Sequence, residues 1–406
     1  METKVATTRK IKVMDGNKAA ANGVLLCQPD VVAAFPITPQ TPLIEAIWKF
    51  VANGQLKAEA VEVEGELSAI SVLIGASAAG GRTFTATSSQ GLAFMYEAYF
   101  RAAGSRLPIV MVVATRELAA PDIVAGGQQD VMSVRDAGWM QIHCETCQEI
   151  LDTIIMSYRI AEDSEILLPI LVCYDGYYLS HLSERVEIPF QEEVDEFLAP
   201  LKAMAKDRPR LSLDHPLTFS AFATGPVFSE YRYKHTAAMT RAKKKIDDVD
   251  GEFKKILGRS WGGVIEEYRC EDAEVVLVAV GSAAGSVRTV VNKKREEGVK
   301  VGLIKLRSIR PFPRERLVNA IRDKKAVGII DRNVCVGWNS GTMFMEMKAL
   351  QADLETRIPM ASFIDGLAGT DITLEHIERA LEITQKAARG EAFQEVTWLG
   401  LEAFSI

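Results

Sequence analysis

The stretch EAVEVEGELSAISVLIGASAAGG, residues 59–81, decides the fold that we expect for this chain. Residues 60–64 alternate apolar and charged side chains with the period of two that is typical of a strand. Gly65 ends this run, and residues 67–80 have the small side chains and the apolar spacing of a tightly packed helix. Glu66 therefore falls between a buried strand and the N-terminus of a buried helix, where the helix dipole stabilises a carboxylate by about 0.3–1 kcal/mol. Taken alone, this pattern is also that of an ordinary acid at a helix start.

Apolar strands alternate with helices from residue 12 to residue 180, and this alternation predicts an α/β fold with a parallel sheet covered on both faces. The strands are expected at 31–35, 60–64, 83–87, 109–115 and 167–173, and the helices at 16–27, 42–53, 67–80, 90–104 and 147–162. In such sheets ligands bind at the carboxyl ends of the strands.

A second α/β unit begins at residue 273. Its strands are expected at 274–281, 299–306 and 325–333. Between the two units the chain is charged, punctuated by prolines and poor in strands, with a polar helix near 228–257. We therefore predict four parts, which are a first domain at 1–182, a connector packed on it at 183–272, a second domain at 273–390 and a tail at 391–406.

Composition excludes several classes of protein. The chain has 406 residues, of which 48% are hydrophobic and 25% charged, and its formal net charge of −7 argues against a nucleic-acid binder. No apolar run approaches the roughly 18–20 residues of a membrane span. The six cysteines are scattered, as expected in a reducing compartment, so we predict a cytoplasmic protein. Cys144 and Cys147 form a lone CxxC, which we interpret as structural or incidental.

Three polar residues lie at predicted strand ends. Thr38 follows strand 31–35, Glu66 follows strand 60–64, and Arg116 ends strand 109–115. An arginine at the end of a valine-rich strand is half-buried and binds an anion well. These residues predict a site for a small carboxylate substrate, without specifying the reaction.

Four long motifs point to a family. They are FPITPQTPLIE (35–45), VEVEGELSAISVLIGASAAGGRTFTATSSQGL (61–92), LPIVMVVATR (107–116) and RSIRPFPRE (307–315). They resemble the α subunits of the pyruvate:ferredoxin oxidoreductase family, which are thiamine-diphosphate-dependent 2-oxoacid:acceptor oxidoreductases. The resemblance implies a pyrimidine-binding thiamine diphosphate domain followed by a domain like the C-terminal domain of transketolase.

The resemblance also implies roles for single residues. Glu66 corresponds to the glutamate that hydrogen-bonds N1′ of the aminopyrimidine ring and so prepares the ring to take a proton from the thiazolium. Arg116 and Thr38 correspond to the substrate-binding arginine and threonine. We expect Ser89 and Gln90, at the end of strand 83–87, to contact the cofactor.

Two motifs are absent from the sequence. It has no GDG…N motif for Mg²⁺ and diphosphate and no cysteine run for an iron–sulfur cluster, so we expect this chain to bind no metal. The resemblance then implies a β subunit that holds the diphosphate and Mg²⁺, with γ and ferredoxin-like δ subunits, iron–sulfur clusters in the partners, coenzyme A as co-substrate, and ferredoxin or an NAD-reducing subunit as acceptor.

One loop departs from the family pattern. Gly126 and Gly127 stand where pyruvate-type members carry larger side chains, and Gln128 replaces a histidine. We therefore predict a roomier or differently polarised pocket, suited to a bulkier 2-oxo acid such as phenylglyoxylate. Neutral drift of this loop in a pyruvate enzyme is the alternative.

The expected function is oxidative decarboxylation of a 2-oxo acid to an acyl-CoA. Two other functions fit the same fold, namely a non-catalytic assembly or regulatory subunit and a thiamine-dependent transferase without a redox step. Residues 281–286 resemble a phosphate cradle, but their spacing is not GxGxxG. A tight strand-to-helix turn is therefore expected there, and a self-contained NAD-dependent dehydrogenase is the remaining alternative.

Overall fold

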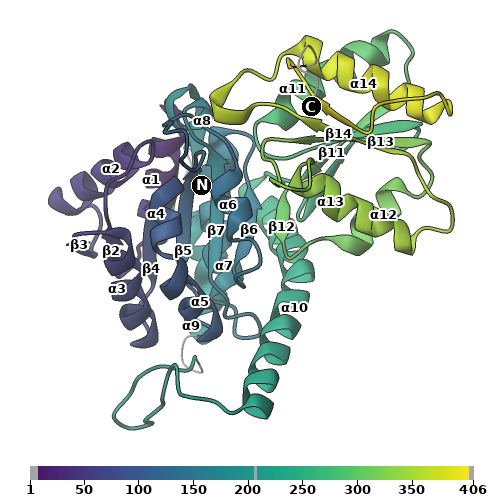
Figure 1. The fold of residues 1–406 in the computed structure, drawn as a ribbon. Coiled ribbons are helices and arrows are strands. Elements are labelled where there is room, and N and C mark those ends of the chain that lie inside the picture. The colour runs from purple at the N-terminus through teal and green to yellow at the C-terminus, as the bar shows by residue number, and fades with distance from the viewer. Residues whose placement is uncertain (1–7, 205–207, 402–406) are drawn as a thin grey trace, which may run out of the picture.

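The computed structural model describes residues 8–204 and 208–401, except for the side chains of residues 202 and 203, and forms two α/β units that lie side by side (Figure 1). The first unit contains a seven-stranded sheet in the order β12-β6-β7-β5-β4-β2-β3. All neighbours in it are parallel except β12, which runs antiparallel to β6. The strands are β2 (Val31–Ala34), β3 (Glu59–Glu62), β4 (Thr83–Thr87), β5 (Val110–Thr115), β6 (Met140–His143), β7 (Ile170–Asp175) and β12 (Ser308–Arg310).

Helices cover both faces of this sheet, as the sequence predicts. One apolar core lies under α1, α2 and α7, and another lies under α3 and α5. The helices of this part are α1 (Gly16–Cys27), α2 (Thr41–Ala52), α3 (Glu66–Ala78), α4 (Ser89–Phe94), α5 (Tyr96–Gly104), α6 (Gln129–Ser133) and α7 (Cys147–Ala161). Because both faces are covered, strands such as β5 are buried along their whole length.

The stretch 59–81 differs from the prediction in two respects. Its strand, β3, is at the edge of the sheet and is largely exposed, so the expectation of a buried strand is wrong. The helix α3 begins at Glu66 itself, one residue before the predicted start. The predicted helix 90–104 is divided into α4 and α5 at Met95.

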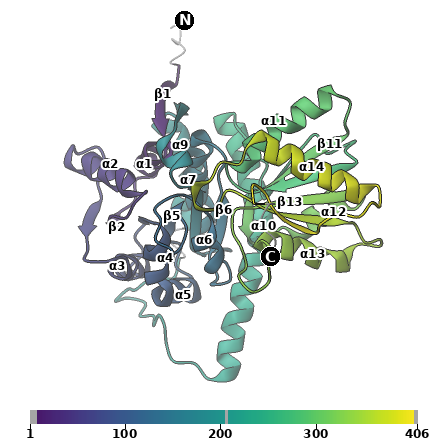
Figure 2. The same cartoon turned by 45° about the horizontal axis from the view of Figure 1, so that its top comes forward.

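The connector region contains more strand than predicted. β8 (Ser183–Ile188) pairs antiparallel with β1 (Lys10–Asp15) at the outer edge of the first unit (Figure 2). The predicted helix near 228–257 is confirmed as α10 (Gly225–Leu257), whose C-terminal part packs on α7 while its N-terminal part projects from the body (Figure 1). The short helix α8 (Tyr178–His181) ends just before this region, and the region also contains α9 (Gln191–Met204) and β9 (Ile265–Tyr268).

The second unit is a six-stranded sheet in the order β15-β14-β13-β10-β11-β9. Helices α11 and α14 cover one face, and α12 and α13 cover the other (Figures 1 and 2). Because β9 precedes residue 273 and β15 follows residue 390, this sheet takes strands from outside the predicted range 273–390. Its further elements are β10 (Val275–Ala279), α11 (Ala283–Glu296), β11 (Val301–Leu306), α12 (Arg314–Ile321), β13 (Ala326–Asp331), α13 (Thr342–Ala349), β14 (Met360–Ile364), α14 (Leu374–Ala388), β15 (Val396–Trp398) and the 3-10 helices η1 (Leu350–Asp353) and η2 (Leu367–Gly369).

A buried ion cluster and a strand exchange join the two units. β12 comes from the second half of the chain but pairs with β6 of the first sheet. Beside it, the Glu149 carboxylate lies 2.7 Å from Lys305 Nζ and 2.7 Å from Arg307 Nε, and all three side chains are buried. The relative placement of the two units is therefore fixed by backbone pairing and by buried charge.

No helix within residues 8–204 and 208–401 combines the length and the apolar character needed to cross a bilayer.

Candidate active site

Glu66 occupies the first position of α3, directly after the N-cap Gly65. Its residue is only 7% exposed, and no ion pair to it occurs among the described residues. Burial raises the pKa of the Glu66 carboxyl above its ordinary value, and a hydrogen bond to the backbone only partly opposes this shift. A carboxyl in this state is suited to hold a proton and to donate it in a hydrogen bond to a ring nitrogen.

The Glu66 carboxyl occupies space that is left free because Gly91 of α4 has no side chain. A Cβ atom at position 91 would lie 2.5 Å from Glu66 Oε1 and 2.4 Å from Thr87 Oγ1, which is closer than any real contact. The Thr87 hydroxyl is buried and has no hydrogen-bond partner in the described structure. The sequence did not predict a role for Gly91 or Thr87, because it does not show which distant side chains lie next to them.

Arg116 and Thr38 are brought together, as expected for the ends of parallel strands. Arg116 Nη1 donates to the backbone carbonyl of Thr38 at 3.0 Å, and Arg116 Nε donates to the carbonyl of Ile123 at 2.9 Å. Arg116 is half-buried and Thr38 is exposed. The guanidinium is thus held beside Thr38 at the carboxyl end of β5, and its role in binding a substrate carboxylate stays a prediction.

Ser89 and Gln90, the predicted cofactor contacts, lie on the turn that leads from β4 into α4. Ser89 is buried in a left-handed backbone conformation (φ 48°), and its hydroxyl lies 2.5 Å from two acceptors, Gln90 Oε1 and the carbonyl of Glu117. Gln90 is half-buried. The Ser89 hydroxyl therefore serves the local backbone, and a contact from either residue to a cofactor stays a prediction.

Asp130 of α6 links these two strand ends and was missed by sequence reasoning. Its Oδ2 accepts hydrogen bonds from the backbone N–H of Ser89 at 2.9 Å and of Arg116 at 3.0 Å, and its Oδ1 accepts one from Val131 at 2.8 Å. Burial raises the pKa of Asp130 to about 7 despite these three donors. The sequence could not predict these contacts, because Ser89 and Arg116 precede Asp130 by 41 and 14 residues.

The loop glycines do not leave free volume, and that part of the prediction is wrong. A Cβ at Gly126 would lie 2.2 Å from the carbonyl oxygen of Gly176, and a Cβ at Gly127 would lie 2.0 Å from Glu117 Oε1. Gln128 is buried, and its Nε2 donates to Asp175 at 3.2 Å. The small side chains make room for the chain itself. Whether these residues also face a substrate stays a prediction.

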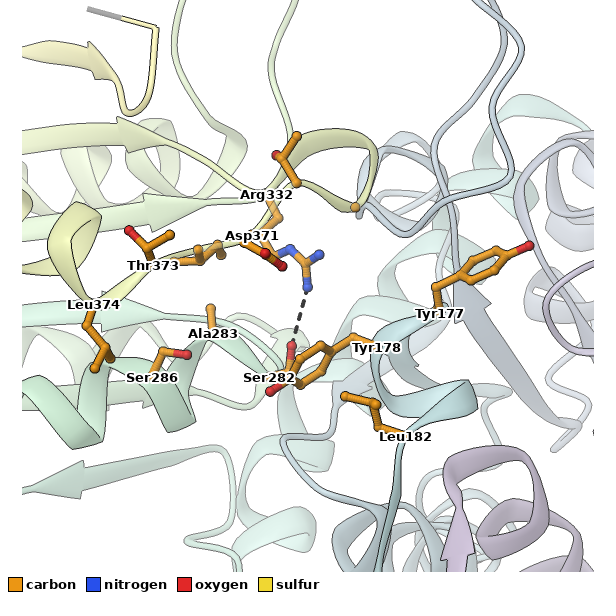
Figure 3. Close-up of a pocket in the computed structure, with 14 residues that line it drawn as sticks. Tyr177, Tyr178, Leu182, Ser282, Ala283, Ser286, Arg332, Asp371, Thr373 and Leu374 are labelled. Atoms are coloured by element: carbon orange, nitrogen blue, oxygen red, sulfur yellow. Dashed lines mark hydrogen bonds between the residues drawn. The ribbon is translucent and has the colours of Figure 1, made fainter.

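A cavity of about 560 Å³ lies where the carboxyl ends of the two sheets meet (Figure 3). Arg332 points toward Ser282 across it and forms an ion pair with Asp175 at 2.9 Å. Ser282 donates to the same carboxylate from its backbone N–H at 2.7 Å. The segment 281–286 is therefore a strand-to-helix turn, as predicted, whose first donors are used within the chain.

No group of three or more histidine, cysteine, aspartate or glutamate side chains that could hold a metal occurs in residues 8–204 and 208–401. Cys144 and Cys147 are both fully buried as free thiols. Burial raises the pKa of Cys144 to about 12 and raises that of Cys147 further. Thiols in this state are poor nucleophiles and poor metal ligands.

Two family descriptions match the chain. "Pyruvate flavodoxin/ferredoxin oxidoreductase, thiamine diP-bdg" matches residues 22–251, and "Pyruvate:ferredoxin oxidoreductase core domain II" matches residues 273–377. The NADH-dependent phenylglyoxylate dehydrogenase subunit alpha of Aromatoleum evansii is 43% identical over 409 aligned residues, covering 98% of this chain and 96% of the relative. Pyruvate synthase subunit PorA of Pyrococcus furiosus is 45% identical over 391 aligned residues, covering 96% and 98%.

Two solved structures share the fold. The 2-oxoglutarate:ferredoxin oxidoreductase of Magnetococcus marinus matches with a TM-score of 0.69 at 19% identity, over 92% of this chain and 65% of that one. A split-gene transketolase matches with a TM-score of 0.53 at 13% identity, over 93% and 100%. These matches confirm the predicted thiamine diphosphate-binding, transketolase-like α/β fold. The chain is thus an α subunit of the pyruvate:ferredoxin oxidoreductase family, whose members are subunits of multi-subunit 2-oxoacid oxidoreductases, and the resemblance found in its sequence is confirmed.

Proposed function

We propose that this chain is the α subunit of a thiamine-diphosphate-dependent enzyme that oxidatively decarboxylates a 2-oxo acid to an acyl-CoA. The observation that carries the proposal is the Glu66 carboxyl, which is buried at a helix N-terminus inside the thiamine diphosphate-binding domain, with no counter-ion in the part of the chain that the structure describes. Burial of that kind is costly unless a bound group uses the carboxyl.

The residues around Glu66 fit the pyrimidine end of thiamine diphosphate. The missing side chain at Gly91 leaves the carboxyl room, and the raised pKa of Glu66 favours the protonated form that donates to a ring nitrogen. When bound, the cofactor supplies carbanion stabilisation that no protein side chain provides. This chain holds the proton at Glu66 and orients the ring against α3 and α4.

The face beside Glu66 supports a site shared with a second subunit. Phe94 is 58% exposed and Tyr96 is 48% exposed, and the Phe94 ring lies 3.1 Å from the position of a Cβ at Gly65. Exposed aromatic side chains next to a buried carboxyl are typical of a surface that a partner covers. We propose that this partner is a β subunit that binds the diphosphate and Mg²⁺, since this sequence has no motif for them.

The substrate side of the proposed site is formed by Arg116 and Thr38. Two bonds to backbone carbonyls hold the Arg116 guanidinium, and its Nη2 has no partner among the described residues. A planar guanidinium held in this way binds a carboxylate in fixed orientation. Thr38 is exposed beside it, and we propose that its hydroxyl donates to a substrate oxygen.

The remaining parts of the proposal concern the complex. We propose that electrons pass to iron–sulfur clusters in γ and ferredoxin-like δ subunits and then to ferredoxin or to an NAD-reducing subunit, with coenzyme A as co-substrate. The relatives are named for pyruvate and for phenylglyoxylate, and both acids are candidates here. The scattered free thiols support a cytoplasmic location.

The test is the reconstituted complex carrying Glu66→Gln. Because general acid–base catalysis contributes about 10²–10⁴-fold, we expect a loss of 2-oxo acid oxidation of that order, with the complex still assembled. Glu64→Gln is the matched control, because Glu64 lies two residues away, is exposed, and bonds only Ser68 among the described residues. Full activity of the Glu66→Gln complex would refute the proposal.

The substrate is tested in the same preparation. Steady-state rates with pyruvate and with phenylglyoxylate, each with coenzyme A and a low-potential acceptor, give the ratio of kcat/KM for the two acids. A clear preference for pyruvate would end the hypothesis of a bulkier acid. Reduction of the acceptor separates the oxidoreductase from a transferase that makes no redox change.

A further inference from the structure

Asp130 is a buried acid that the proposed chemistry does not use. The Asp130 residue is 1% exposed and forms no ion pair with any described residue. The ionisable groups that face it are the Glu117 carboxyl and the Cys173 thiol, and neither offers a positive charge. The Arg116 guanidinium donates instead to the carbonyls of Ile123 and Thr38.

The partners of Asp130 lie on two different strand ends. One is the backbone N–H of Ser89, at the end of β4, and the other is the backbone N–H of Arg116, at the end of β5. Both bonds reach the same oxygen, Oδ2. The distance between these two points of the backbone is therefore set by a single atom.

Each strand end leads to one half of the candidate site. From Ser89 the chain turns, with a positive φ, into α4, where Gly91 lies against the Glu66 carboxyl. From Arg116 the side chain extends to the Thr38 carbonyl. A shift at either N–H would move the Glu66 side of the site relative to the Arg116 side.

We propose that Asp130 is a positioning residue, whose carboxylate fixes the turn that seats Glu66 against the strand end that carries Arg116. The inference rests on the proposed function, because it requires that both residues act on one bound assembly of cofactor and substrate. A displacement of about 1 Å between such groups costs on the order of 10²-fold in rate. An acid that served only to hold the fold together would change stability alone.

The experiment compares Asp130→Ala and Asp130→Asn in the assembled complex. Alanine removes both acceptor oxygens and so all three hydrogen bonds, whereas asparagine keeps an oxygen for Ser89 and Arg116 but turns an N–H group toward Val131. We expect kcat/KM for the 2-oxo acid to fall by about 10²-fold for alanine and about tenfold for asparagine. We also expect thiamine diphosphate to bind more weakly in the same order, measured by titration of the complex without substrate.

Asp163→Asn is the control for the loss of a buried carboxylate away from the site. Asp163 is equally buried and accepts a backbone N–H from Glu165 at 3.0 Å, but unlike Asp130 it pairs with cations, Lys245 at 2.7 Å and Arg159 at 3.8 Å. It lies after α7, away from the strand ends that carry the site. Its substitution is expected to lower the temperature of thermal unfolding while leaving KM and cofactor affinity unchanged.

Two results would overturn the proposal. One is an Asp130→Ala complex with normal kcat, KM and cofactor affinity per assembled complex, even if it melts earlier. The second applies if the alanine variant does not assemble, and it is an Asp130→Asn complex with normal kcat, KM and cofactor affinity. Failure of the proposed function is recognised separately, because there Glu66→Gln is fully active.

Discussion

The molecule buries carboxylates in two contrasting ways. Glu149, between the two units, is fully buried and bonded to Lys305 and Arg307. Asp130 and Glu66, beside the strand ends of the first unit, are buried and pair with no cation among the described residues. Burial alone would raise the pKa of each acid, but the two cations outweigh it at Glu149 and lower its pKa, whereas the pKa of Asp130 rises to about 7.

We interpret this difference as a division between buried acids that stabilise the fold and buried acids that serve the candidate site. The close ion pairs to Lys305 and Arg307 offset the desolvation of the Glu149 carboxylate. They also join the two units, so we interpret Glu149 as an acid with a structural role. An acid left without a cation weakens the fold, so its presence at a strand end points to a bound group or to positioning. The three predictions below test this division, starting with the largest effect.

The largest effect is expected from Arg307→Met in the Glu149 cluster. The substitution removes the bond to Glu149 Oε1 and leaves the carbonyl of Gly263 and the hydroxyl of Thr153 without their donor. Breaking a buried pair in this way costs about 3–5 kcal/mol. Thermal unfolding of the full chain should therefore begin at a markedly lower temperature.

Lys325→Met is the control for that substitution. Lys325 pairs with Glu274 at 2.7 Å, but both side chains are exposed, so the expected cost is about 0–1 kcal/mol. If the Arg307→Met and Lys325→Met variants unfolded at the same temperature, the cluster would stabilise the fold no more than a surface pair does. The distinction drawn between Glu149 and Asp130 would then be wrong.

An intermediate effect is expected from Gly91→Ala. The new methyl group would overlap Glu66 Oε1 and Thr87 Oγ1, and relieving such a clash costs about 1–3 kcal/mol. Because the displaced group is the Glu66 carboxyl, we expect kcat to fall by about 10–100-fold. Gly251→Ala, in the interior of α10, where the new Cβ meets no described atom within 4 Å apart from its own helix backbone and chain neighbours, should leave kcat unchanged. Equal activity of the two variants would show that Gly91 does not place Glu66.

The last prediction concerns the dependence of stability on pH. Asp130 has a pKa of about 7 when folded and about 3.9 when unfolded, so its contribution to stability is full below about pH 4 and is lost as the pH rises through 7. Glu149, with a lowered pKa, behaves oppositely, because its contribution is present above about pH 4.5 and is lost in acid.

The measurement is the unfolding temperature of wild type and Asp130→Asn between pH 5 and pH 8. Wild type should lose stability relative to the variant as the pH rises. Parallel curves would mean that the Asp130 carboxyl is not perturbed by burial.

Local patterns were sufficient to predict much of the fold. The period of two in residues 60–64 and the alternation of apolar strands with helices are visible without any tertiary contact, and so is the long helix α10. β12 was missed, because three residues in a proline-rich turn become a strand only through pairing with β6. The exposed edge position of β3 was missed for the same reason, since strand order is not a local property.

Most of the candidate site residues were named because they follow a recognisable strand. Glu66, Thr38 and Arg116 were found in this way, and the structure places Arg116 beside Thr38. Asp130 and Gly91 were missed, since their roles depend on contacts with distant segments. The loop glycines were misread because a missing side chain can make room for the chain itself as well as for a ligand.

The most direct test of the account is a structure of the assembled complex with thiamine diphosphate bound. The account predicts that the Glu66 carboxyl lies within hydrogen-bond distance, about 2.6–3.2 Å, of N1′ of the pyrimidine ring, with the diphosphate held by the partner subunit. A ring bound beyond the reach of that carboxyl, or a Glu66 side chain turned into the packing of α3, would contradict it.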